Sequence, residues 1–225
     1  MSKPTLWHCY GSRSLRALWA LEEMGIDHEL IELPFPPRIF DRDYLKTNAL
    51  GTVPFFRDGE QEMTESSGIC LYLVEKYQRH DFGLKPDHAE YGDYLNWLFH
   101  SDATLTFPQT IVLRYSQLEP KAKRLPQAVE DYSKWFLARL KRLNAHLPGR
   151  EYLVDDRFTI ADIAVGYALC FAETLGLDQF FEPVVSEYLA RLKARPAFQK
   201  ANAVGAENSL FKPVKYPFEN APELM

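Results

Sequence analysis

The sequence lacks the long apolar run that a membrane-spanning helix needs, which is about 20 consecutive residues. Its first ten residues, MSKPTLWHCY, also lack the charged and then apolar pattern of a secretory signal. Cysteine is scarce: Cys9, Cys70 and Cys170 are far apart, and no Cys-x-x-Cys pair occurs. Such usage is typical of a reducing compartment and predicts neither a disulfide framework nor a metal site. We therefore expect a cytoplasmic protein without metal and without a membrane partner.

An excess of positive charge is also missing, since 26 Lys and Arg residues face 31 Asp and Glu residues, for a net charge of -5. This balance gives no reason to expect a nucleic-acid partner. What the chain does have is length and apolar content: 225 residues, of which 46% are hydrophobic. These values suffice for one large domain or two small ones.

The first 80 residues predict alternating strands and helices. A short apolar stretch at 5–9 predicts a strand, the apolar spacing of 12–24 before Gly25 predicts a helix, and 27–33 alternates like a second strand. A proline-rich loop at 34–38 and a short helix at 41–47 follow. With the hairpin and helix of 50–77, the order is βαβαββα, the sequence of elements of a thioredoxin-like domain over residues 1–80.

The remainder of the chain predicts helices only. Residues 81–87 are a linker, 88–204 form an all-α domain, and 205–225 are an irregular C-terminal arm. Pro108 should kink or divide the first long helix, since proline removes a hydrogen bond inside a helix. In Phe158-Thr159-Ile160-Ala161-Asp162, Thr159 can cap a helix and Asp162 can reach back to it.

The stretch 50–77, LGTVPFFRDGEQEMTESSGICLYLVEKY, carries the most specific pattern. Proline at 54 favours an extended Val53. About one X-Pro bond in twenty is cis, and in that form the Val53 backbone groups would point outward, where a peptide could pair with them. The Glu65-Ser66 pair opens the next helix, with Ser66 as the expected cap, and free amides at a positive helix end suit a carboxylate.

The pattern G-x-V-P at 51–54, followed by E-S-x-x-I-x-x-Y-L from Glu65, resembles the glutathione site of the soluble glutathione transferases. The likeness covers roughly residues 5–200 and includes the F-T-x-A-D motif at 158–162. It implies that Thr52, Val53 and Pro54 hold the cysteinyl part of glutathione. Glu65 and Ser66 are then expected at its γ-glutamyl end, with Ser66 for the carboxylate and Glu65 for the ammonium. Asp102 is similar to an acid that some bacterial members contribute across the dimer to the same ammonium.

A candidate for activating the thiol lies in the segment His8-Cys9-Tyr10-Gly11-Ser12-Arg13-Ser14. A free thiol with a pKa near 8.5 is only a few per cent thiolate at pH 7, and a hydroxyl donor at a helix N-terminus can lower this pKa. Alignment with serine-type, bacterial members of the family puts the activating serine on Ser12. Ser14 shares the same helix start, and Tyr10 is the fallback. Cys9 is expected to be a buried small residue and not a nucleophile.

We expect apolar side chains to cover the electrophile site. Five aromatic residues offer it: Tyr10, Phe35, Phe40, Phe107 and Tyr115. Phe107 and Tyr115 share one helical face if the helix continues through Pro108, although that face could equally pack in the core against the next helix. Tyr115 ends the stripe among polar residues, where a phenol can face water and bond an oxyanion. This cover favours a flat, aromatic electrophile.

The leading hypothesis is thus a glutathione transferase of detoxification. One alternative is a glutathione-dependent isomerase, lyase or ether-cleaving enzyme of small-molecule catabolism, and another is a non-catalytic module with this fold that binds a protein partner. The resemblance also implies a homodimer. Many members insert an aromatic residue at the position before G-x-V-P into the neighbouring subunit, and here that residue is Leu50. The subunit contact should therefore be flatter.

Overall fold

The computed structural model describes residues 3–208, which form two compact units. The first unit combines 3–88 with 193–208, and the second covers 89–192. The expected C-terminal arm lies outside the described residues except for 205–208. Within those four residues, Ala206–Asn208 form a short 3-10 turn.

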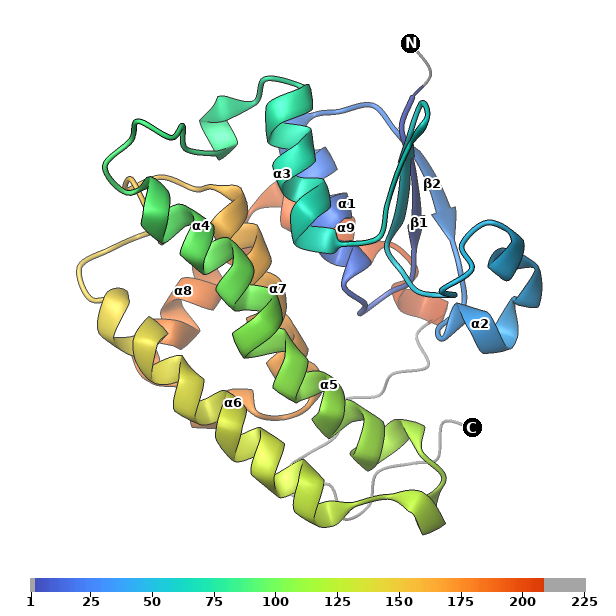
Figure 1. Cartoon of the computed structure of the whole chain (residues 1–225). Helices are drawn as coiled ribbons and strands as arrows, with labels where there is room; N and C mark the ends of the chain where they lie inside the picture. The colour runs from blue at the N-terminus through green and yellow to red at the C-terminus, as the bar shows by residue number, and fades with distance from the viewer. Residues whose placement is uncertain (1–2, 209–225) are drawn as a thin grey trace. The chain divides into compact units, whose positions relative to one another are not determined.

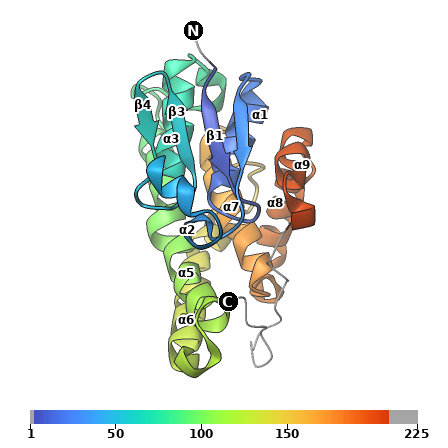
Figure 2. The same ribbon diagram turned by 90° about the vertical axis from the view of Figure 1, so that its right-hand side faces the viewer.

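The first unit contains a four-stranded sheet in the order β2-β1-β3-β4, and Figure 2 shows β4, β3 and β1 side by side. β1 pairs with β2 in parallel and with β3 antiparallel, and β3 pairs antiparallel with β4. This confirms the thioredoxin-like βαβαββα arrangement. Its elements are β1 Thr5–His8, α1 Ser14–Met24, β2 Glu29–Glu32, α2 Pro37–Phe40, β3 Phe55–Asp58, β4 Gln61–Met63 and α3 Ser66–Lys76.

The segment between β2 and β3 has the expected short helix, as a 3-10 helix, and one further helix that begins in the expected loop. The α-helix occurs earlier, at Pro37–Phe40, and a 3-10 helix follows it at Arg42–Lys46. Proline suits the first position of a helix, where its missing N–H would have no partner and its fixed φ is already helical. The proline-rich sequence therefore starts a helix here instead of excluding one.

Helices α1 and α3 lie on one side of the sheet and α2 on the other (Figure 1). The helix α9 Pro196–Ala203 packs on α1, where the rings of Trp19 and Phe198 meet edge to face with centroids 4.9 Å apart. The ranges predicted from sequence placed this helix with the all-α domain. In the structure, its contacts group it with the first unit.

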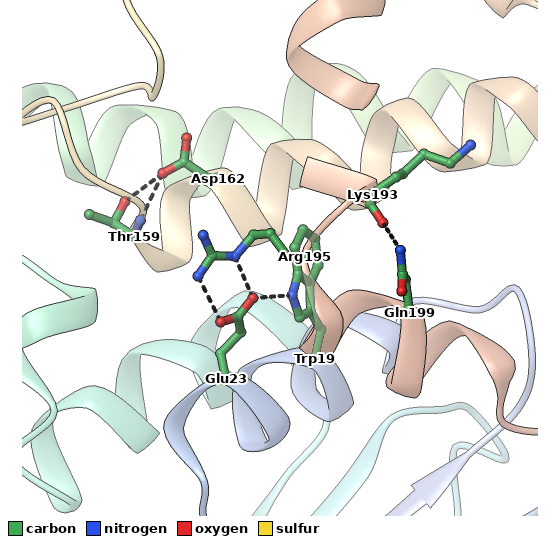
Figure 3. A network of polar contacts seen from close by, with 7 residues as sticks. All are labelled: Trp19, Glu23, Thr159, Asp162, Lys193, Arg195 and Gln199. Carbon is green, nitrogen blue, oxygen red and sulfur yellow. Dashed lines mark hydrogen bonds and ion pairs between the residues drawn. The ribbon is translucent and has the colours of Figure 1, made fainter. Parts of the chain in front are cut away.

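A polar network joins α1 to the chain before α9 (Figure 3). The carboxylate of Glu23 accepts two hydrogen bonds from Arg195, Nε at 2.6 Å and Nη2 at 2.8 Å. It also accepts one from the indole N–H of Trp19 at 2.9 Å. Bidentate arginine–carboxylate pairs are the stronger ion pairs, and the Glu23 side chain is nearly buried. The network therefore holds α9 in place over Trp19.

The described part of the second unit is helical, with only an isolated bridge between Val154 and Arg157, which confirms the all-α prediction. Between α4 and α5, and again after α5, the chain runs as π-helix, at Ser101–Thr106 and Arg114–Leu118. Pro108 lies in the first turn of α5, directly after the π-helical segment, so the long helix continues past the proline with an altered hydrogen-bonding pattern beside it. Within residues 3–208, no helix is long and apolar enough to cross a membrane. The α-helices are α4 Tyr91–His100, α5 Phe107–Leu113, α6 Pro126–His146, α7 Ile160–Thr174 and α8 Pro183–Lys193.

Helix α7 is the buried centre of the second unit, and α4 packs against it. Its start has the expected capping box: Thr159 accepts from the Ala161 N–H, and Asp162 accepts from the Thr159 N–H at 2.8 Å (Figure 3). Asp162 also accepts from the N–H of Leu153 and the hydroxyl of Tyr188. Burial raises the pKa of Asp162 to about 6, and these hydrogen bonds oppose the rise.

Replacing Asp162 with alanine should cost about 3 to 5 kcal/mol of unfolding free energy, since four buried hydrogen bonds to its carboxylate are lost together. Thr159→Ala is the matched control and should cost about 1 kcal/mol, the usual value of a cap. Urea-induced unfolding of both variants measures the difference. Equal losses would show that the carboxylate stabilises α7 only as a local cap.

Candidate functional site

The loop before Pro54 has room for glycine only. Gly51 has a φ of +59°, and a Cβ built there would lie 2.7 Å from Arg38 Cβ and 2.9 Å from Leu45 Cδ2. Both the positive φ and the close approach exclude a side chain. The glycine of G-x-V-P is therefore required by the packing of this loop against the segment from α2 to the following 3-10 helix.

The Val53–Pro54 peptide bond is cis, which is the less common alternative considered from the sequence. The Val53 side chain is buried in a cluster with Trp7, Cys9, Tyr44 and Phe55. Within residues 3–208, the backbone N–H and C=O of Val53 have no hydrogen-bond partner. These two groups remain available to a ligand.

Thr52 is placed differently from its neighbour. Its carbonyl accepts hydrogen bonds from the Tyr44 hydroxyl at 2.7 Å and from Asn48 Nδ2 at 2.9 Å. Both donors come from the segment that packs under this loop, so the Thr52 carbonyl is already used inside the protein. Of the two residues expected to bind through their backbone, Val53 is the better placed, and Thr52 fixes the loop.

The start of α3 corrects one detail of the sequence interpretation, because the cap position is occupied by Glu65 and Ser66 is the first helical residue. Glu65 is exposed, whereas Ser66 is buried, with 3% of its surface exposed. Ser66 Oγ accepts a hydrogen bond from Arg16 Nη1 at 3.0 Å. The hydroxyl proton of Ser66 is then left to donate elsewhere, at a helix end that favours anions.

Arg16 was missed by the sequence interpretation. It lies in the first turns of α1 and is fully buried, and arginine is almost never buried without partners. The available signal was an arginine on a helix whose neighbouring positions are nearly all apolar. Its partner Ser66 is fifty positions away in the sequence, so spacing alone does not identify it.

The turn between β1 and α1 brings Ser12 and Ser14 together, with their Oγ atoms 2.7 Å apart. Gly11 has a φ of 69°, and the Ser12 N–H donates to the Cys9 carbonyl at 3.2 Å. Helix α1 begins at Ser14, so Ser12 lies just before the helix, where its Oγ accepts from the Ser14 N–H at 3.3 Å. Ser14 is fully buried, and Ser12 is slightly exposed at its edge.

His8 ends β1 and continues this chain of polar groups, since its Nδ1 lies 2.8 Å from Ser14 Oγ. The ring is 1% exposed. Burial lowers the pKa of His8 to about 4, while a hydrogen bond between the ring and the backbone of Val204 raises this pKa more weakly. The imidazole is therefore neutral at pH 7. No sequence feature predicted this contact, because His8 had no feature beyond its place in a strand.

Cys9 is a buried thiol, as expected, with its Sγ 3.7 Å from the Pro34 carbonyl. Burial raises the pKa of Cys9 to about 12, which leaves almost no thiolate at pH 7. Among the described residues, no group of three or more His, Cys, Asp or Glu side chains could hold a metal ion.

The aromatic residues expected at the electrophile site fall in both units. In the first unit, Tyr10 is half-buried beside Gly205, Phe35 packs against the Trp7 cluster, and Phe40 is exposed. Of these three, Phe35 is held most firmly, because it belongs to the packing around the cluster.

In the second unit, Phe107 begins α5 and is half exposed, with its ring 6.3 Å from that of Tyr132. Tyr115 lies in the π-helical segment, half-buried under the Arg114 guanidinium. Asp102 is half-buried in the other π-helical segment. Such segments often occur at functional sites, but the sequence predicted only a break near Pro108.

Two family models match this chain. The glutathione S-transferase N-terminal domain matches residues 6–81, and the glutathione S-transferase C-terminal domain matches residues 102–196. The chain belongs to the glutathione S-transferase family. A curated relative in this family, glutathione S-transferase 3 of Zea mays, is 29% identical over 203 residues, which cover 84% of this chain and 88% of the relative.

Solved structures of the family have the same fold. A glutathione transferase of Phanerochaete chrysosporium, in complex with oxidised glutathione, is 26% identical with a TM-score of 0.77, covering 92% of this chain and 98% of that one. A theta class glutathione S-transferase of Xanthomonas axonopodis pv. citri, with glutathione bound, is 26% identical with a TM-score of 0.73, covering 91% of this chain and 99% of that one.

The buried His8 should make stability depend on pH. Its pKa is about 4 in the folded protein and about 6.5 in the unfolded chain, so the unfolded chain binds more protons between these values. The stabilisation is full above pH 6.5 and is lost as the pH falls toward 4. Over this window, wild type should lose up to about 3 kcal/mol more unfolding free energy than His8→Asn. Urea unfolding at several pH values compares them, and parallel losses would contradict a buried neutral His8.

Proposed function

We propose that the protein binds glutathione on its first unit, stabilises the thiolate, and adds it to a small, flat electrophile. The observation that carries this proposal is that side chains of α1 hydrogen-bond to two buried serine hydroxyls, those of Ser12 and Ser66. Ser12 precedes the helix and hydrogen-bonds to Ser14 at its start, and Arg16, two residues further on, hydrogen-bonds to Ser66. Ser12 Oγ accepts from the Ser14 N–H and Ser66 Oγ accepts from Arg16, so each hydroxyl can offer its proton to a ligand.

The peptide part of glutathione suits the groups around Pro54 and the start of α3. The free N–H and C=O of Val53 can pair with the cysteinyl backbone, as one strand pairs with another. The Ser66 hydroxyl and the N-terminus of α3 suit the γ-glutamyl carboxylate, and the exposed carboxylate of Glu65 suits its ammonium. Thr52 and Pro54 hold Val53 in place. Asp102 remains a candidate for the same ammonium, from the partner subunit of a homodimer.

The Ser12 hydroxyl is proposed to donate to the thiolate. Lowering a thiol pKa by two units corresponds to about 2.7 kcal/mol of stabilisation of the ionised form. A charge-assisted hydrogen bond supplies about 1.5 to 3 kcal/mol, and the adjacent N-terminus of α1 adds to it. The two together account for a thiolate at neutral pH. Ser14 is fully buried, which favours Ser12 as the group that meets the ligand.

The residues proposed to contact the electrophile are Tyr10, Phe35 and Phe40 in the first unit, with Phe107 and Tyr115 of the second unit as separate candidates. Tyr115 is the best candidate for a specific role, because its phenol can donate to an oxygen that gains charge during the reaction. Phe107 contacts Tyr132 and contributes first to packing. We also propose a homodimer with a flat contact near Leu50, which is 65% exposed, and a cytoplasmic location, since all three cysteines are free thiols.

Retention on immobilised glutathione, followed by a panel of electrophiles, tests the function as a whole. Conjugation of aromatic electrophiles is the expected result. Retention with isomerisation or reductive cleavage alone would favour the catabolic alternative, which uses the same thiolate. A protein that does not bind glutathione would instead be a protein-binding module with this fold.

Ser66→Ala should lower the affinity for glutathione by about 1.5 to 3 kcal/mol, since it removes a donor to a carboxylate. It should also lower the unfolding free energy by about 1 to 3 kcal/mol, because buried Arg16 loses an acceptor. Calorimetric titration and urea unfolding measure the two effects. Ser67→Ala, at the next buried serine, is the control and should keep the affinity of wild type. Unchanged affinity in Ser66→Ala would remove Ser66 from the site.

Ser12→Ala should leave glutathione affinity nearly intact and raise the pKa of the bound thiol by about 1 to 2 units, since the thiolate loses its hydroxyl donor. The ultraviolet absorbance of the thiolate against pH measures this value. Ser14→Ala is the comparison, and its shift should be smaller, because Ser14 acts on the thiol only through Ser12. A shift in Ser14→Ala without one in Ser12→Ala would identify Ser14 as the activating serine.

A further inference from the structure

The carbonyl of Thr52 is held by two side-chain donors from one short segment. The Tyr44 hydroxyl donates to it at 2.7 Å and Asn48 Nδ2 at 2.9 Å, and the same Asn48 nitrogen lies 3.4 Å from the Tyr44 oxygen. Both side chains are buried. Buried polar groups need partners inside the protein, and here two of them are directed at a single oxygen.

The direction of these hydrogen bonds is set by partners that have only one role. The Thr52 oxygen is a carbonyl and can only accept. The Leu50 N–H can only donate, and it donates to Asn48 Oδ1 at 3.1 Å, which assigns the amide of Asn48 with its nitrogen toward Thr52. Burial raises the pKa of Tyr44, and the hydrogen bond from Asn48 opposes this rise, so the phenol keeps its proton and donates it.

The two donors also set the direction of the next amide, because the Thr52 C=O and the Val53 N–H belong to one peptide group. The peptide bond between these residues is trans. In a planar trans peptide, the C=O and the N–H point in opposite directions. The carbonyl points at Tyr44 and Asn48, so the Val53 N–H points away from them, and it has no hydrogen-bond partner among residues 3–208.

The turn that precedes this peptide leaves it little freedom. The Asn48 carbonyl accepts from the Gly51 N–H at 2.8 Å, and the Asn48 N–H donates to the Tyr44 carbonyl at 2.9 Å. The Tyr44 ring packs in the same cluster as the Val53 side chain. A donor that is held in one orientation before a ligand arrives loses little freedom on binding. Hydrogen bonds to the carbonyl also polarise the peptide group, which strengthens its N–H as a donor by about 10 to 30% per bond.

We propose that Tyr44 and Asn48 are positioning residues that, through the Thr52 carbonyl, aim the Val53 N–H at the cysteinyl carbonyl of glutathione. The inference rests on the proposed function, in which the Val53 backbone pairs with the cysteinyl backbone, and it adds the reason why this amide meets the ligand as a donor. It also defines what the loop selects, which is a thiol that carries a peptide carbonyl beside it. A thiol without that carbonyl gains nothing from the two residues.

Tyr44→Phe is the sharpest variant, because it removes one donor to Thr52 and keeps the ring in its cluster. KM and Kd for glutathione should rise about two- to tenfold, the value of one neutral hydrogen bond. The kcat and the pKa of the bound thiol should stay at wild type, because Ser12 lies on another element. Tyr72→Phe is the matched control, since it removes a hydroxyl that donates to Asp58 in the same unit, and its affinity for glutathione should equal that of wild type.

A second ligand separates positioning from general damage to the site. In this analogue of glutathione, a carbon–carbon double bond replaces the amide between cysteine and glycine, so the cysteinyl carbonyl is gone while the thiol and the γ-glutamyl group remain. Calorimetric titration should show that Tyr44→Phe binds glutathione about two- to tenfold more weakly than wild type does. Wild type and Tyr44→Phe should bind the analogue equally.

Three results would overturn the proposal. Equal weakening of glutathione and the analogue is what a merely structural role of Tyr44 predicts. Unchanged affinity for glutathione in Tyr44→Phe would show that the hydroxyl does not act on the ligand. A change in the pKa of the bound thiol without a change in affinity would show that it acts on the sulfur and not on the peptide.

The orientation of the peptide can be measured without glutathione, by NMR of the isotope-labelled protein. We expect a coupling across the hydrogen bond between the Asn48 side-chain nitrogen and the Thr52 carbonyl carbon. In Tyr44→Phe, the Thr52 carbonyl signal should move upfield, because the carbonyl loses a donor. Absence of the coupling, or an unmoved signal, would overturn the proposal, and the coupling in wild type decides if Tyr44→Phe does not fold. Failure of wild type to bind glutathione refutes the proposed function and the ligand named here, and the NMR result then decides separately whether the two residues orient the Val53 N–H.

Discussion

Helix α1 is buried between the sheet, α3 and α9, so every polar side chain on its buried faces needs a partner inside the protein. Its start, its first turns and its end meet this requirement in three different ways. Ser14 bonds to His8, Arg16 bonds to Ser66, and Glu23 bonds to Arg195. The first two of these contacts lie at the hydroxyls of the candidate site, and the third attaches α1 to the segment before α9. The site is thus a consequence of how a buried helix satisfies its polar groups.

Ser12 and Ser66 have a common arrangement, although they come from different elements. Each is nearly buried, and each accepts a hydrogen bond from a group behind it, the Ser14 backbone N–H or the Arg16 guanidinium. Each therefore keeps a donor for a negatively charged atom, a thiolate in one case and a carboxylate in the other. Donors that are oriented before the ligand arrives need little reorganisation when charge develops, which makes them effective.

Local features of this chain were predictable from its sequence. The order of elements in the first unit followed from apolar spacing, the irregularity beside Pro108 from the chemistry of proline, and the capping box from Thr159 and Asp162 three positions apart. The resemblance around Gly51 and Glu65 identified the family. These signals all lie within one element or one turn, where spacing in the sequence fixes spacing in the structure.

Contacts between distant segments could not be predicted in the same way. Arg16 reaches Ser66, and Arg195 reaches Glu23, across separations that no periodicity describes. His8 and Ser14 are close in the sequence, but their contact depends on how the turn at Gly11 folds back. The cap of α3 was placed one residue too late, since Glu65 and Ser66 are both plausible at a helix start and only the backbone geometry separates them.

The position of α9 has a consequence for how the protein is made. The first unit begins at the N-terminus, but its cover over Trp19 is supplied by Phe198, and the partner of Glu23 by Arg195. During synthesis, the ribosome must therefore translate the whole second unit before the first can close. Until then, an aromatic face and a carboxylate of α1 stay exposed, a condition in which nascent chains tend to aggregate and chaperones bind them. For the same reason, a fragment that ends at His88 is an incomplete unit rather than a small domain.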